Sequence, residues 1–165
     1  NPNRLAQNDT DALWTKKNNV SYFGYKNHVK QDSGSKLITK YTVTDASVHD
    51  SQQTEPLLEK KDKGEPFYAD SAYTGPKQEE AIASKEMENQ VCEKGAKNRP
   101  LTEEQKENNR IKSKVRSRVE HIFGFMEMSM NGMYLHSIGI KRITAIVGLM
   151  NLTYNMFRKL QLTGA

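Results

Sequence analysis

The fold class is decided by residues 21–44, which read SYFGYKNHVKQDSGSKLITKYTVT. The first part, up to Val29, is rich in aromatic and apolar residues, and residues 37–44 are rich in β-branched residues that favour strands. Between them, residues 32–35 (Asp-Ser-Gly-Ser) are typical of a turn. The stretch therefore predicts a hairpin of two antiparallel strands.

Downstream of this hairpin, short helices and short strands alternate. In chain order we expect a helix over about 51–60 with Asp50 as its cap, a strand over 67–69 that ends at Asp70, a helix over about 77–85, and a strand over 90–93. A long helix follows with Thr102 as its N-cap and ends before the polar residues 129–132, and a last helix spans about 142–160. This last helix is apolar enough to be mostly buried. The order predicts an α/β fold with one mixed sheet covered by helices.

Length and composition fit one domain, at 165 residues with 35% hydrophobic and 27% charged residues. We interpret residues 1–20 as a polar arm or loop and residues 21–165 as the domain. No stretch approaches the roughly 20 apolar residues of a membrane helix, so no membrane association is expected. The single cysteine, Cys92, suits a reducing compartment and a cytoplasmic location, and it is interpreted as a small buried hydrophobe.

Charge is distributed unevenly along the chain. Residues 1–93 carry 12 Lys and Arg against 15 Asp and Glu, a balance of −3, whereas residues 94–165 carry 13 against 5, a balance of +8. A strongly basic half is typical of proteins with a polyanionic partner such as DNA. A basic face that is merely solvated remains the alternative.

Two carboxylates stand out as candidates for chemistry. Asp70 directly follows a short apolar strand, where α/β folds place their ligands, although an Asp in this position can also cap a turn. Glu120 lies four residues after Arg116, on the same face of the predicted helix. It is the only acid between Asn108 and Met126. A surface ion pair with Arg116 is the simpler interpretation of Glu120.

A single chemistry would use both carboxylates. Phosphodiester cleavage without a covalent enzyme intermediate uses two divalent metals about 3.5–4 Å apart. Carboxylates are the natural ligands of Mg²⁺, for which Mn²⁺ can substitute. We therefore expect Asp70 and Glu120 to converge on shared metal ions. The cations expected to hold the DNA backbone are Lys112, Lys114, Arg116 and Arg118 on the helix, with Lys16, Lys17 and Lys26 near the start of the chain.

Five segments resemble, in family order, the catalytic domain of insertion-sequence transposases of the IS5 group, within the IS4-like DDE transposases. They are residues 13–30, 42–51, 68–75, 116–124 and 148–158. The resemblance implies an RNase H-like fold and Mg²⁺-dependent DNA cleavage and strand transfer at inverted-repeat ends, with a homo-oligomer as the expected assembly. It implies that Asp70 is the second catalytic Asp, and that Glu120 is the catalytic Glu of an Arg-x-x-x-Glu signature with Arg116 as its Arg.

The chain departs from the family pattern at three places. Ser113 stands where the wider group has a Tyr, and Glu127 stands where it has a Lys. The strand that carries the family's first catalytic Asp has no counterpart here, because Asp9 and Asp11 lie in a polar segment that does not match it. We therefore expect this chain to lack the first strand of the sheet and to be inactive by itself. We also expect an exposed sheet edge beside residues 22–29, unless the arm of residues 1–20 covers it.

Some further residues are weaker candidates for lining the site. His28 lies on the first predicted strand, where a structural role is the simpler interpretation. Asp45, and His49 with Asp50, follow the second strand and are candidates for bordering the site, with capping as the simpler interpretation. Two other functions stay open beside the transposase: a metal-dependent nuclease of the same fold that cuts without joining ends, and a non-catalytic module for DNA binding or assembly.

Overall fold

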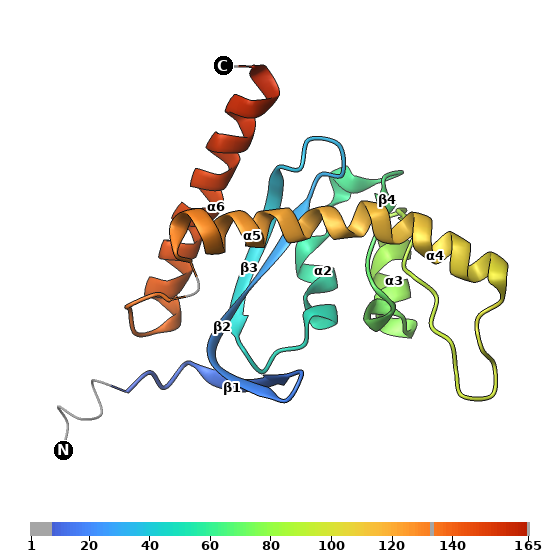
Figure 1. The fold of residues 1–165 in the computed structure, drawn as a ribbon, viewed down its shortest axis with the longest axis horizontal. Helices are drawn as coiled ribbons and strands as arrows, with labels where there is room; N and C mark the ends of the chain where they lie inside the picture. Colours follow the sequence, from blue (N-terminus) through green and yellow to red (C-terminus); the bar gives the residue numbers. More distant parts are fainter. Residues whose placement is uncertain (1–7, 133, 165) are drawn as a thin grey trace. The chain divides into compact units, whose positions relative to one another are not determined.

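The computed structural model describes residues 8–132 and 134–164. The chain forms two compact units, which are described separately: Asn1–His49 with Ile122–Ala165, and Asp50–His121. Figure 1 shows the elements of each unit in the colours of the sequence. The α/β class expected from the sequence is confirmed, but the strands form two sheets in the described residues instead of one mixed sheet: three antiparallel strands in the first unit and two parallel strands in the second.

The first unit is built on three antiparallel strands in the order β1 (Leu13–Lys17), β2 (Val20–Gln31) and β3 (Ile38–Asp45). The predicted hairpin is confirmed as β2 and β3, which pair from Tyr25↔Asp45 to Gln31↔Ile38. β1 forms inside the segment expected to be a polar arm. It does so because Asn18 and Asn19 both adopt positive φ, at 51° and 63°, as a two-residue hairpin turn requires.

Helix α6 (Ile140–Thr163) is tied to the β2–β3 hairpin by side-chain amides. The amides of Asn27 and Asn151 exchange two hydrogen bonds, with N···O distances of 2.8 and 3.3 Å. Asn155 accepts from the backbone N–H of Ile38 and donates to its carbonyl, both at 2.8 Å. An amide that offers both a donor and an acceptor can replace a strand partner at this end of β3. These bonds set the position of α6 along the hairpin.

Apolar packing completes this interface. Tyr154 of α6 is buried, lies 5.7 Å from the Phe125 ring, and donates from its hydroxyl to the Lys36 carbonyl. The backbone of Gly148 lies so close to Tyr41 that a Cβ there would be 2.5 Å from the tyrosine hydroxyl. α5 (Glu120–Met130) contributes Phe125, so the core of this unit combines α5, α6 and the inner face of the hairpin.

The expectation that the last helix is mostly buried is wrong. One face of α6 is buried, but Leu149 is 64% exposed and Met156 60% exposed, and Leu152 and Phe157 are more than half exposed. The hairpin covers only the face that carries Asn151 and Tyr154. A helix that is apolar on most sides needs partners on several sides to be buried, and the described residues cover only part of α6.

The N-terminus of α6 is held by two aspartates. Asp9 accepts hydrogen bonds from the Gly139 backbone N–H at 3.2 Å and from the Tyr25 hydroxyl at 2.6 Å, and Asp11 accepts from the Ile140 N–H at 3.0 Å. Burial raises the pKa of Asp9, but these hydrogen bonds outweigh it and leave the pKa below its usual value. The two carboxylates satisfy N–H groups that the helix itself leaves free, and their charge complements the helix dipole.

The second unit contains a parallel pair of short strands, β4 (Pro66–Phe67) and β5 (Glu88–Asn89), joined through α3 (Pro76–Ser84). The hydrogen bonds extend beyond these bounds. The carbonyls of Glu65, Phe67 and Ala69 accept from the N–H groups of Glu88, Gln90 and Cys92. The predicted strand that ends at Asp70 is therefore supported. The strand expected at 90–93 is instead β5 at Glu88–Asn89, and at 90–93 the ladder continues only through the N–H groups of Gln90 and Cys92.

Around this ladder lie the remaining elements of the second unit. Leu58, Ala69, Ile82 and Val91 form its buried core. The single helix expected over 51–60 is instead three short segments, because Pro56 has no N–H with which to bond the preceding turn. The elements are η1 (Asp50–Gln53), α2 (Thr54–Leu57), η2 (Lys60–Asp62), η3 (Ser71–Tyr73), α4 (Glu103–Arg116) and η4 (Ser117–Val119).

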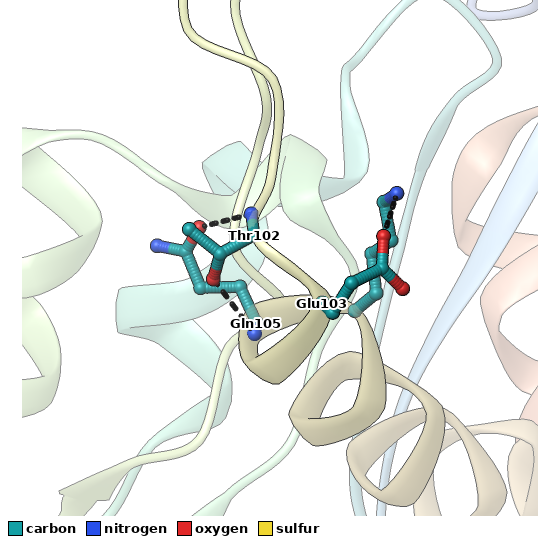
Figure 2. A network of polar contacts seen from close by, with 4 residues as sticks. Thr102, Glu103 and Gln105 are labelled. Atoms are coloured by element: carbon teal, nitrogen blue, oxygen red, sulfur yellow. Dashed lines mark hydrogen bonds and ion pairs between the residues drawn. The ribbon is translucent and has the colours of Figure 1, made fainter.

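The predicted cap of the long helix is confirmed. The Thr102 hydroxyl accepts from the Gln105 N–H, and the Gln105 side chain accepts from the Thr102 N–H, as Figure 2 shows. This reciprocal pair starts α4 at Glu103. The helix does not run uninterrupted as expected: a 3₁₀ turn, η4, separates α4 from α5. No helix in the described parts of the chain is both long enough and apolar enough to cross a membrane.

We predict that Asn151→Ala lowers the free energy of unfolding by about 1–3 kcal/mol, because it leaves the amide of Asn27 without its partner. Urea unfolding followed by circular dichroism measures this. Thr153→Ala, on an exposed side of the same helix, is the control and should change stability by less than about 0.5 kcal/mol. Equal stabilities of the two variants would contradict the structural role of the amide pair.

We predict that Asp9→Asn removes part of the stability present above about pH 4. A carboxylate whose pKa is depressed in the folded state stabilises the protein above its unfolded pKa, 3.8 here, and this contribution is lost as the pH falls through the folded pKa. The variant should lose about 0.3–1 kcal/mol at pH 7 and show a weaker loss of stability below pH 4. Melting temperatures between pH 2.5 and 7 test this, with exposed Glu127→Gln as the control.

Candidate catalytic and DNA-binding site

Asp70 lies where the parallel ladder ends. The Ala69 carbonyl accepts the last strand hydrogen bond, from the Cys92 N–H at 3.0 Å, and the backbone then turns into η3. The Asp70 carboxylate accepts from the Ala72 N–H at 2.9 Å and caps this 3₁₀ turn. Its side chain is exposed to solvent. Both interpretations of Asp70 therefore agree with its position, since one carboxylate oxygen can cap the turn while the other faces solvent.

A second acid and a tyrosine accompany Asp70. Burial raises the pKa of Tyr73 well above its usual value, and the negative charges of Asp50 and Asp70 raise it further. The Tyr73 hydroxyl therefore lies within the electrostatic influence of both carboxylates. The Tyr73 ring packs edge-on to Phe67 of β4, with centroids 6.3 Å apart. Asp50 and Asp70 thus both act on the Tyr73 hydroxyl beside the end of the ladder.

Tyr73 received no role from the sequence. Asp50 was interpreted as a helix cap, with a place at the border of the site as the alternative. A signal for Tyr73 exists in the sequence, because it follows Asp70 by three residues and one turn brings it back beside the carboxylate. The signal for Asp50, which precedes Asp70 by 20 residues, is only its place after the second predicted strand.

Glu120 is the first residue of α5, directly after the 3₁₀ turn η4. Its carboxylate lies 3.9 Å from the Arg116 guanidinium, with the Glu120 side chain 69% exposed and the Arg116 side chain 32% exposed. An ion pair this long and this exposed contributes little to stability. The Nε of Arg116 is buried, and no acceptor for it lies among the described residues.

Asp70 and Glu120 belong to the same compact unit. Each has its own partner, the Ala72 N–H for Asp70 and the Arg116 guanidinium for Glu120. Among residues 8–132 and 134–164, no three His, Cys, Asp or Glu side chains gather into a group that could hold a metal ion. Convergence of the two carboxylates on shared metals remains a prediction.

Helix α4 is anchored beside the strand ladder. Asn109 accepts from the Glu93 N–H at 2.8 Å and donates to the Glu93 carbonyl at 3.0 Å. One turn later, the Lys112 ammonium donates to the Val91 carbonyl at 3.2 Å, and Ser113 lies 3.7 Å from the Cys92 sulfur. These contacts hold the basic helix against the strand that pairs with β4.

The cations expected to bind DNA therefore differ in their surroundings. Lys114 is exposed, whereas Lys112 already donates to a carbonyl. Arg116 is engaged with Glu120, and Arg118 is partly buried. In the first unit, Lys16 and Lys17 are exposed on β1, and Lys26 donates to the Val48 carbonyl at 2.7 Å. Lys114, Lys16 and Lys17 are the most accessible of the seven.

His28 and Asp45 have local partners. His28 is buried, and its Nε2 lies 2.8 Å from the Thr44 hydroxyl across the hairpin. Asp45 accepts from the Ser47 N–H at 2.8 Å and from the Ser47 hydroxyl at 2.5 Å, and these bonds, against a smaller effect of burial, lower the pKa of Asp45. These contacts are those of a structural histidine and a turn-capping aspartate. A role in lining the site stays a prediction for both.

Comparison with known proteins places these residues in a family. Residues 3–156 match the model of a protein family described as "Transposase DDE domain". A curated relative, the transposase for insertion sequence element IS1106 of Neisseria meningitidis serogroup B, is 31% identical over 150 residues. The match covers 91% of this chain and 52% of the relative, so the chain spans about half the length of that protein. No solved structure matches the chain.

We predict that Asp70→Ala and Asp70→Asn separate the capping role of Asp70 from its charge. Alanine removes the acceptor for the Ala72 N–H and should lower the free energy of unfolding by about 0.5–2 kcal/mol, whereas asparagine keeps a capping oxygen and should cost less. Thermal unfolding of both variants measures the difference. If the two variants are equally destabilised, the carboxylate charge, and not the cap, matters for stability.

Proposed function

Because this chain belongs to the transposase DDE domain family of insertion sequences, we propose that it forms part of a transposase catalytic domain of RNase H-like fold. The proposed reaction is metal-dependent cleavage of phosphodiester bonds and strand transfer at the ends of the element. The observation that carries the proposal is the position of Asp70, an exposed carboxylate at the end of a parallel strand ladder. DNA is the proposed partner, and a homo-oligomer the proposed assembly.

Asp70 and Glu120 are the proposed catalytic and metal-binding residues. Both offer exposed carboxylate oxygens, which are the hard ligands that Mg²⁺ and Mn²⁺ prefer. The donor chemistry therefore fits a divalent metal, as part of a ligand set that needs roughly three carboxylates. When bound, such metals activate the attacking oxygen and stabilise the leaving oxygen of the phosphodiester.

The protein's own groups position the DNA. Lys114 is exposed on the helix that Asn109 anchors beside the strand ladder, so its ammonium can bind a backbone phosphate. Arg116 holds Glu120 by an exposed pair that is weak enough to exchange for a phosphate or a metal ligand. In-line phosphoryl transfer depends on placement, and an anchored helix supplies a fixed position for these groups.

A non-catalytic DNA-binding or assembly module is the second candidate, and the charge of the chain is compatible with it. Residues 94–165 carry a net charge of +8, which supports DNA binding with or without catalysis. A metal-dependent nuclease of the same fold differs from the transposase only in lacking strand transfer. A strand-transfer assay distinguishes the nuclease from the transposase.

We predict that residues 1–165 do not nick DNA by themselves, because two carboxylates hold a second metal poorly and Mg²⁺ demands near-octahedral geometry. The assay uses supercoiled DNA with Mg²⁺ or Mn²⁺, on this chain and on a chain extended by any residues that precede Asn1 in the gene. Nicking by the extended chain should vanish in Asp70→Asn and in Glu120→Gln, and persist in Glu127→Gln.

Two results would change this proposal. Nicking by residues 1–165 that vanishes in Asp70→Asn would mean that these residues supply the third carboxylate. Asp45→Asn and Asp50→Asn would then be compared. Asp45 is the first candidate from the sequence, and Asp50 is the acid whose negative charge, like that of Asp70, raises the pKa of Tyr73. DNA binding without nicking by any extended chain would favour the non-catalytic module.

We also predict that DNA binding weakens steeply with salt and shows little sequence preference, because phosphate contacts carry no base information. Lys114→Ala should lower the slope of log affinity against log salt by about one unit, as expected for one lost phosphate contact. Lys112→Ala should lower it less, since its ammonium already donates to Val91. Fluorescence anisotropy at several salt concentrations measures both slopes, and an unchanged slope for Lys114→Ala would place the DNA elsewhere.

A further inference from the structure

The hairpin formed by β1 and the first half of β2, residues 13–24, exposes aromatic side chains. We call these residues the aromatic hairpin. Trp14 is 64% exposed and Phe23 is 52% exposed. The two residues face each other across the strands, and their ring centroids lie 5.2 Å apart with the planes tilted by 48°. The rings therefore form one continuous aromatic surface that is open to solvent.

The geometry of the hairpin holds this surface in place. Successive side chains of a strand point to opposite faces, so Trp14 and Lys16 share one face with their partners Phe23 and Ser21. The other face carries Lys17 and Tyr22. The turn at Asn18 and Asn19, with both residues at positive φ, has the twist of a tight hairpin connection. A rigid platform loses little conformational freedom when a ligand binds.

The charge around the rings selects the kind of ligand. Residues 12–31 contain Lys16, Lys17, Lys26 and Lys30 and no Asp or Glu. Lys16 and Lys17 are exposed at the end of β1, Lys16 on the face of the rings and Lys17 on the opposite face. A partner protein with an apolar surface would contact the rings but not the lysines. A ligand that combines flat rings with negative charge would contact both the rings and the lysines. Nucleic acid is such a ligand.

We propose that Trp14 and Phe23 form a stacking platform for an unpaired base of DNA, and that Lys16, on the same face, holds a neighbouring phosphate. The bases of an intact duplex are already stacked on one another, so the platform takes a base only at a single-stranded end or where a base is extruded. This inference rests on the proposed function, which makes DNA the substrate, and adds that this chain distinguishes unpaired from paired bases.

The test uses the fluorescence of Trp14, which is the only tryptophan of the chain. Three DNA probes are compared: a blunt duplex, the same duplex with a short thymidine overhang, and the same duplex with an abasic overhang of equal length. Stacking should quench Trp14 emission with the thymidine overhang only. The abasic overhang supplies the same phosphates without bases, and it should change the emission no more than the blunt duplex does.

Variants provide the affinity arm, measured by anisotropy of labelled DNA. Trp14→Ala and Phe23→Ala should each weaken binding of the thymidine overhang by about 5- to 150-fold, the effect expected for loss of one stacked base, and should leave binding of the abasic overhang unchanged. Tyr22→Ala, on the opposite face and 48% exposed, is the matched control and should have less than a twofold effect. Trp14→Tyr should retain most of the affinity, and circular dichroism checks that each variant folds.

Several results would overturn the platform. Equal affinity for thymidine and abasic overhangs would do so, as would equal effects of Tyr22→Ala and Phe23→Ala. A blue shift of Trp14 emission that grows with protein concentration, without DNA, would show instead that the hairpin is an interface between copies of the chain. Nicking by the extended chain that needs Asp70, without base-dependent quenching, would overturn the platform alone. Base-dependent quenching without nicking by the extended chain would support the platform and count against the catalytic proposal.

Discussion

The amide pair between Asn27 and Asn151 is the interaction on which the first unit depends. Asn151 is buried in the middle of α6, where a polar side chain costs free energy unless its hydrogen bonds are satisfied. Only one position of the helix satisfies it, and that position also brings Asn155 to the backbone of Ile38. Apolar contacts alone would tolerate a shift of α6 by a turn, whereas these amides do not.

In the second unit, a different amide sets the position of the basic helix. Asn109 bonds both backbone groups of Glu93, just beyond the strand that pairs with the one preceding Asp70. The neutral side chain of Asn109 therefore sets the position of the charged residues of α4. This explains why Lys112, which would look like a phosphate contact in any basic helix, instead donates to the Val91 carbonyl.

Local patterns predicted the elements that local chemistry controls. The β2–β3 hairpin and the Thr102 capping box form as expected, because turn residues and caps act within a few residues of the chain. The position of Asp70 at a strand end was also predicted. The break at η4 and the exposure of Leu149 and Met156 were not, because helical periodicity does not say which apolar face finds a partner.

The sequence by itself determined the class of elements, the excess of positive charge in the second half and the candidate carboxylates, since each follows from residue type and short-range spacing. Only the tertiary structure decided which polar groups meet. Asp9 and Asp11 accept hydrogen bonds at the start of α6, about 130 residues away in the sequence. The negative charges of Asp50 and Asp70 both raise the pKa of Tyr73. Such pairings depend on how distant segments pack, and contacts between residues so far apart in the sequence produce no periodic pattern along the chain.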